Sequence, residues 1–189
     1  MSKFIKVAGI GCAVLLVLVV GIVVVAYNMV DDELAYETSF EVDRPVDVAW
    51  AVFSDEERMT EWMPGLIRMD LMEGEYETVG SKYRLVFDEN GQTMEMIETI
   101  TAIEPEEEFA FSFTMEEALM EGEIRVLFEG QGERTTIRTE NVVRGKSLMK
   151  IFVPLMREQM VARQELGYRQ LADMIEAETG AATEAPAGD

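Results

Sequence analysis

The 189-residue sequence predicts an α+β domain, in which a curved antiparallel sheet packs against one long C-terminal helix, preceded by one transmembrane helix. Three observations predict this fold. Residues 147–178 have a helical period, several segments between residues 66 and 144 alternate apolar and polar side chains, and residues 7–30 contain no charged residue. Connections are short and strands do not alternate with helices, so the sheet is expected to be antiparallel.

The N-terminal apolar run leads to a division of the chain into four parts. A membrane-spanning helix needs about 20 apolar residues, and residues 7–30 are long enough to form one. Lysines precede the run and acidic residues 31–33 follow it, so the positive-inside rule places residues 1–6 in the cytoplasm. Residues 31–178 would then form a domain on the extracytoplasmic side, and residues 179–189 a disordered tail. The alternative is a cleaved signal peptide, which the length of the run disfavours.

The composition argues against several classes of function. The chain has 37 acidic and 16 basic residues and a formal charge of −21, which repels phosphate backbones, so nucleic acid is not an expected partner. There is no histidine and only one cysteine, Cys12, which excludes histidine-based triads, the usual zinc sites and disulfides within the chain. No metal or cofactor is expected, and acid–base chemistry would depend on carboxylates, lysine, tyrosine or water.

The predicted domain begins with one strand and two short helices. Residues 37–42 alternate apolar and polar side chains, as a half-buried strand does. Residues 46–53 place their apolar side chains on one face of a short helix. Ser54 and Asp55 can cap a second short helix over residues 56–62.

Six further segments predict the rest of the sheet. In each of them apolar and polar residues alternate, which is the period of a strand with one buried face. Asn90 and Gly91 form a two-residue hairpin signal between two of these strands. The six segments are residues 67–71, 82–87, 92–103, 109–115, 124–129 and 137–143.

The long helix over residues 147–178 has two distinct faces. Because its apolar face cannot be stable in water alone, the helix needs an apolar partner surface, which the sheet can supply. The charged face carries Glu158, Glu165, Arg169, Asp173 and Glu176. The apolar face carries Met149, Val153, Met156, Met160, Gly167, Leu171 and Met174.

Several segments resemble a known family: residues 44–53 (RPVDVAWAVF), residues 61–65 (EWMPG), residues 79–83 (VGSKY), and Pro154 early in the long helix. Over residues 35–177 the chain resembles START-like proteins of the SRPBCC superfamily, specifically the polyketide cyclase/dehydrase and lipid-transport branch. The resemblance implies a helix-grip fold, in which the sheet wraps around the C-terminal helix and often leaves an apolar cavity. Members include lipid and sterol carriers, hormone receptors and aromatase/cyclases, so the fold alone does not determine the chemistry.

Three functions follow as hypotheses. The first is a membrane-anchored START-like domain that binds a hydrophobic or amphipathic small molecule, such as a lipid, between the sheet and the helix. The second is a cyclase- or dehydrase-like enzyme that uses Glu98, Tyr83 or Arg163, although no residue pair at a recognisable spacing supports catalysis. The third is an interaction module whose core is filled and which binds no ligand.

Nine residues are predicted to line the cavity that the resemblance implies. Arg163 occupies a step missing from the apolar face of the helix, where it can clamp a ligand carboxylate or phosphate, or pair internally, for example with Glu98. Asn141 can point inward or form a hydrogen bond at the sheet edge, and Trp62 can lie in the core or at the cavity mouth. The nine residues are Trp62, Tyr83, Glu98, Asn141, Met156, Gln159, Met160, Arg163 and Gly167.

Overall fold

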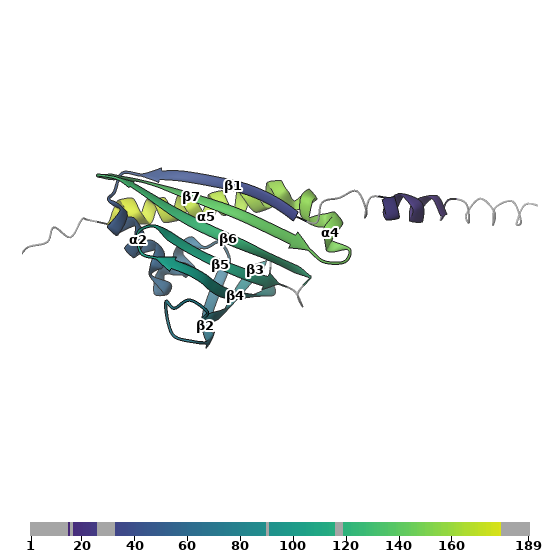
Figure 1. The fold of residues 1–189 in the computed structure, drawn as a ribbon, viewed down its shortest axis with the longest axis horizontal. Coiled ribbons are helices and arrows are strands. Elements are labelled where there is room, and N and C mark those ends of the chain that lie inside the picture. Colours follow the sequence, from purple (N-terminus) through teal and green to yellow (C-terminus); the bar gives the residue numbers. More distant parts are fainter. Residues whose placement is uncertain (1–14, 16, 26–32, 90, 116–118, 179–189) are drawn as a thin grey trace, which may run out of the picture.

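The computed structural model describes residues 15, 17–25, 33–89, 91–115 and 119–178. In this part of the chain a seven-stranded sheet is ordered β1-β7-β6-β5-β4-β3-β2, with every neighbouring pair antiparallel. Figure 1 shows the long helix α5 running along the sheet beside β1 and β7. The prediction of an antiparallel α+β domain of the helix-grip type is confirmed.

The strands follow the alternating segments of the sequence. β3 and β4 are joined by a two-residue connection, since Glu89 pairs with Gln92, and Gly91 takes a positive φ of 84°, as the hairpin signal predicts. The strands are β1 (Glu33–Val42), β2 (Leu66–Glu73), β3 (Lys82–Glu89), β4 (Gln92–Glu104), β5 (Glu108–Met115), β6 (Met120–Gln131) and β7 (Arg134–Gly145).

The helices gather on one face of the sheet. Asp55 caps the first turn of η1, its carboxylate accepting a hydrogen bond from the Glu57 N–H at 3.1 Å. The α-helices are α2 (Val46–Ser54), α3 (Met59–Trp62), α4 (Met149–Phe152) and α5 (Arg157–Ala177), and the 3-10 helices are η1 (Glu56–Arg58) and η2 (Val153–Met156).

The predicted C-terminal helix is interrupted near its start. Residues 149–177 form α4, η2 and α5 in place of one continuous helix, and Pro154 lies in η2. Proline has no N–H to donate and its ring crowds the preceding turn, so the regular helix begins only at Arg157. The predicted charged face of α5 is exposed throughout, whereas its buried face is centred on Gly167, Tyr168, Leu171 and Ile175.

The prediction of a membrane-spanning helix over residues 7–30 is wrong. No helix within the described residues has both the length and the apolar character that a membrane crossing requires. The same finding overturns the expected membrane location, extracytoplasmic side and membrane partner. The predictions for residues 1–6, the cleavage site and the tail at 179–189 lie outside the described residues.

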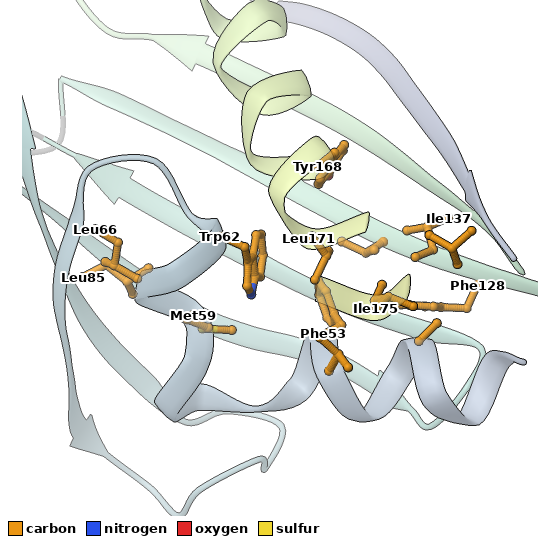
Figure 2. Packing of buried hydrophobic residues seen from close by; sticks show 14 of the residues in the cluster. Phe53, Met59, Trp62, Leu66, Leu85, Phe128, Ile137, Tyr168, Leu171 and Ile175 are labelled. Atoms are coloured by element: carbon orange, nitrogen blue, oxygen red, sulfur yellow. The ribbon is translucent and has the colours of Figure 1, made fainter. Parts of the chain in front are cut away.

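The core lies between the helices and the sheet face that they cover, here called the inner face. Figure 2 shows Phe53, Trp62 and Leu171 packed against this face. The ring of Phe53 lies 5.8 Å from that of Trp62 and 5.2 Å from that of Phe128, so α2, α3 and β6 meet in one aromatic cluster. A second, smaller cluster around Phe113 and Val153 occupies the end of the sheet near η2.

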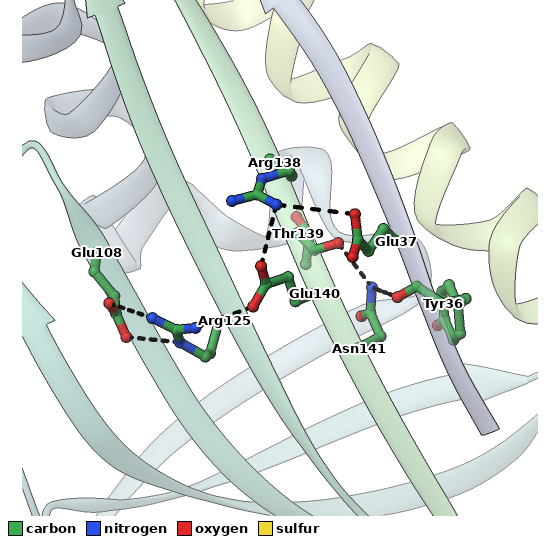
Figure 3. A network of polar contacts seen from close by, with 8 residues as sticks. All are labelled: Tyr36, Glu37, Glu108, Arg125, Arg138, Thr139, Glu140 and Asn141. Atoms are coloured by element: carbon green, nitrogen blue, oxygen red, sulfur yellow. Dashed lines mark hydrogen bonds and ion pairs between the residues drawn. The ribbon is translucent and has the colours of Figure 1, made fainter. Parts of the chain in front are cut away.

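The opposite face of the sheet, here called the outer face, carries a ladder of ion pairs (Figure 3). Arg125 binds Glu108 through two nitrogens at 3.0 and 2.8 Å and Glu140 through a third at 3.0 Å. Arg138 joins Glu140 to Glu37. Because these groups are largely exposed, each pair contributes little to stability, but together they hold the charged side chains away from the inner face.

Candidate ligand-binding face

Strand register brings the predicted carboxylate Glu98 to the middle of the inner face. On β4 it lies directly between Tyr83 of β3 and Phe113 of β5. The same cross-strand row continues to Gly122 of β6 and Val143 of β7. A Cβ added to Gly122 would come within 2.7 Å of the Phe113 ring, so the absence of a side chain at this position allows the ring to lie across β6.

Apolar side chains surround this row and remain partly exposed. The helix α5 packs mainly against β1, α2 and α3, so the middle strands of the inner face are only partly covered. Side chains that face inward there would be fully buried in a closed core, yet several keep contact with solvent. The partly exposed inner-face residues are Met94 and Met96 of β4, Phe111 and Met115 of β5, and Ile124 of β6, together with Met160 of α5.

Glu98 itself is buried, with 5% of its surface exposed. Burial in apolar surroundings disfavours the charged form, and the nearby Glu56 carboxylate adds repulsion, which together raise the pKa of Glu98 to about 8. The carboxyl group is therefore mostly protonated at neutral pH. Within the described residues it makes no side-chain hydrogen bond or ion pair.

Tyr83 and Glu56 border Glu98 on the β3 side. The Tyr83 hydroxyl accepts a hydrogen bond from the Glu77 N–H at 3.2 Å. Burial and the Glu56 carboxylate raise the pKa of Tyr83 to about 12, so the phenol stays protonated. Burial also raises the pKa of Glu56, and its interaction with Tyr83 opposes that rise. This end of the inner face thus combines two carboxyl groups and a phenol.

Asn141 points inward and belongs to a closed polar network. It exchanges two hydrogen bonds with Gln164 of α5, at 2.9 and 3.2 Å. The Gln164 oxygen also accepts from Thr38 at 3.0 Å, and its amide donates to the Tyr168 hydroxyl at 3.0 Å. Thr139 completes the network through the same hydroxyl. Because these groups satisfy one another, they attach α5 to β1 and β7.

Arg163 is engaged by the protein itself. It pairs with Glu89, not with Glu98, so the partner suggested by the strand pattern is wrong. Its second terminal nitrogen donates to the Pro64 carbonyl at 2.5 Å, and the guanidinium lies 5.6 Å from the centre of the Phe87 ring. Burial lowers the pKa of Arg163. The arrangement ties α5 to the turn after α3 and to the β3–β4 hairpin, and a role as a ligand clamp stays a prediction.

The remaining predicted residues are dispersed. Trp62 is 5% exposed and lies in the core, and its indole N–H has no hydrogen-bond partner among the described residues. Gly167 is buried where a Cβ would come within 2.9 Å of Pro64, so it allows α5 to approach the turn after α3 closely. Met156 is half-buried in η2, and Gln159 is exposed.

Sequence reasoning missed most of the apolar part of the face. Phe111, Phe113 and Met115 follow the same strand alternation that points Glu98 inward, so that alternation could have identified them. Glu56 had no such signal, because only the packing of η1 near Tyr83 gives it a role. The described residues contain no group of three or more side chains suited to hold a metal ion.

Comparison with solved structures supports the fold. The chain resembles the ZhuI aromatase/cyclase from Streptomyces sp. R1128, with 17% identity, a TM-score of 0.65, and coverage of 80% of this chain and 98% of that one. It also resembles Ara h 8.0201, with 12% identity, a TM-score of 0.63 and coverage of 77% and 99%. For the major latex-like protein 151 of Panax ginseng the identity is 16%, the TM-score 0.59 and the coverage 76% and 98%. At these identities the likeness concerns the fold alone.

The family assignment comes from sequence. A search of curated proteins finds no match. Residues 33–176 match the family model described as polyketide cyclase / dehydrase and lipid transport, and this segment contains the whole sheet and nearly all of α5. The chain therefore belongs to the polyketide cyclase / dehydrase and lipid transport family, within the START-like SRPBCC superfamily.

Proposed function

We propose that the protein binds a hydrophobic or amphipathic small molecule, such as a lipid, on the inner face of the sheet. The observation that carries this proposal is the set of partly exposed apolar side chains on β4, β5 and β6, including Met96, Phe111 and Ile124. Covering apolar surface gains about 25 cal/mol per Å², so a ligand that shields these side chains from water would be bound favourably.

The side chains of the face suit a flexible apolar ligand. Met96 and Met115 pair across β4 and β5 on the inner face and belong to the same apolar cluster as Met160 of α5. Met94 lies on the same face of β4, two residues from Met96, and packs against the larger cluster. Methionine is unbranched and polarisable, so it can repack around ligands of different shape. Such a surface favours a long aliphatic or aromatic molecule over a small polar one.

The proposal is tested by native mass spectrometry of the full chain after gentle purification. We expect a reproducible added mass that organic solvent extracts. Met96→Trp should lower the occupancy, because the larger ring fills the inner face, whereas Ile97→Trp on the outer face of the same strand should not. A bare mass that persists after incubation with mixed lipid extract would contradict the proposal and favour an interaction module with a filled core.

A second candidate function is cyclase- or dehydrase-like catalysis, which one observation favours. Glu98 is a buried acid that keeps its proton at neutral pH beside the Tyr83 phenol, and a general acid must carry a proton at its working pH. The test incubates the extracted ligand with excess protein and follows its mass over time. Conversion by the wild-type chain that stops in Glu98→Gln would support catalysis, and an unchanged ligand mass would support binding alone.

A further inference from the structure

We propose that the ligand of the inner face carries a protonated amine, and that the Glu98 carboxylate binds it. The inference rests on the proposed function, because it names the chemical class of the ligand for the same face. It adds a recognition group that the apolar surface alone does not supply.

Glu98 differs from the other buried residues of the described chain that carry a hydroxyl, amide or carboxyl group. Ser81, Thr135, Thr139 and Asn141 are the other polar side chains buried in the described part of the chain, and each of them makes a side-chain hydrogen bond. Glu98 makes none, although its carboxyl group has the largest capacity for such bonds. Its oxygens are not among the fully buried atoms without a partner, which in the described residues are Nε1 of Trp62 and Nε of Arg84. The carboxyl group therefore keeps some solvent contact, and its hydrogen-bonding capacity is open to a ligand.

The charges around Glu98 on the inner face are mainly negative. In the described strands, every lysine and arginine occupies an outer-face position: Arg68, Lys82, Arg84, Arg125, Arg134, Arg138 and Arg144. Arg163 of α5 approaches from the inner side, but Glu89 and the Pro64 carbonyl engage it. Arg157 of α5 acts on Tyr36 of the edge strand β1, which lies four places from β4 in the strand order. Beside Glu98, a ligand carboxylate or phosphate would therefore meet two carboxyl groups, Glu98 and Glu56, and none of these cations.

Aromatic residues lie on both sides of Glu98, where the cation of a ligand would bind. Glu98 lies between the aromatic residues Tyr83 and Phe113 in the cross-strand row. The faces of aromatic rings attract ammonium groups, and the attraction is stronger where water is excluded. The net charge of −21 also raises the local concentration of cations at the protein surface. An ammonium group is therefore favoured over an anionic or neutral head group.

Binding changes the protonation state of Glu98. The free carboxyl group holds its proton at neutral pH, whereas an ammonium ligand pairs with the carboxylate. The proton of Glu98 must then leave to solvent, and the ammonium group keeps its three protons. Binding of an amine should therefore release close to one proton per ligand at pH 6, whereas binding of an alcohol should release none.

The experiment compares decylamine, decanol and decanoate with the full chain at 150 mM salt, by calorimetry below the aggregation limit of each probe. We expect decylamine to bind about ten-fold more tightly than decanol, and decanoate to bind most weakly. Calorimetry in buffers with different ionisation enthalpies measures the proton release, which needs no variant.

Two variants test whether Glu98 causes the preference for decylamine and the proton release. Glu98→Gln should abolish the advantage of decylamine over decanol and the proton release, and thermal unfolding checks that the variant folds. Glu95→Gln makes the same substitution at an exposed position on the outer face of β4 and should leave all three affinities unchanged.

The outcomes separate this inference from the proposed function. Decanol binding without any preference for the amine, or an amine preference that persists in Glu98→Gln, would overturn the inference and leave the proposed function standing. Decanoate as the tightest probe would also overturn it. Binding of none of the three probes would overturn both.

Discussion

The burial of Glu98 predicts a pH-dependent stability that Glu98→Gln should remove. The carboxyl group has a pKa of about 8 in the folded protein, against an ordinary value of 4.5. Between these values the folded chain holds a proton that the unfolded chain has lost. Raising the pH therefore favours unfolding, and the stability from the protonated form is complete below pH 4.5 and lost progressively as the pH rises through 8.

The expected magnitude follows from the size of the shift. Each pH unit within the window costs about 1.4 kcal/mol, so the free energy of unfolding of the wild-type chain should fall by about 3 to 4 kcal/mol relative to Glu98→Gln between pH 5 and pH 8. The side chain is 5% exposed, so solvent screening reduces this value little. Glutamine has nearly the same shape as glutamate and does not titrate. The titration of the other carboxyl groups contributes equally to both proteins, so it cancels when their free energies of unfolding are subtracted.

Urea unfolding of both proteins at pH 5, 6, 7 and 8 and constant salt measures this difference. Glu95→Gln is the matched control, because it changes an exposed residue on the outer face of the same strand. It should follow the wild-type chain at every pH. A difference between the wild-type chain and Glu98→Gln that stays constant from pH 5 to 8 would refute the reasoning, because it would mean that Glu98 titrates alike in the folded and unfolded chain.

Three further substitutions test contacts that hold the face together. Gly122→Ala should destabilise the domain by about 1 to 3 kcal/mol, because the new methyl group would come within 2.7 Å of the Phe113 ring; an unchanged melting temperature would contradict the close packing. Gln164→Leu leaves the Asn141 side-chain oxygen without its donor, while the Asn141 amide keeps the carbonyls of Tyr36 and Thr139, and should cost about 1 to 3 kcal/mol in urea unfolding; no loss would mean that the network does not attach α5. Arg163→Met should lower stability by about 1 kcal/mol and leave ligand occupancy in native mass spectrometry unchanged, whereas lower occupancy with an intact fold would favour the clamp.

Much of the fold was predictable because local patterns encode it. Alternation over residues such as 82–87 and 109–115 assigned side chains to one face, and the two-residue hairpin set the register of β3 against β4. The apolar run at 7–30 shows the limit of such patterns, since composition predicted a span and no helix of the described residues is long and apolar enough to cross a membrane.

The candidate site was only partly predictable. Glu98, Tyr83 and Met160 were identified from their faces, and the structure brings Glu98 and Tyr83 side by side. Trp62 was identified too, but it lies in the core, and Gln159 is exposed. The periodicity of the sequence cannot distinguish a core residue from a residue that lines a binding face, because a residue on an apolar face can meet either a packed neighbour or open space.

By itself the sequence determined the strands, their alternation, and the charged face of α5, since each depends on residues close together in the chain. Only the tertiary structure decided the partners. Arg163 pairs with Glu89, 74 residues away, and Gln164 with Asn141, 23 residues away. The tertiary structure also decided that Glu98 has no side-chain hydrogen-bond or ion-pair partner among the described residues. The physical reason is that periodicity gives the direction of a side chain, whereas strand order and the position of α5 over β1 determine what lies opposite it.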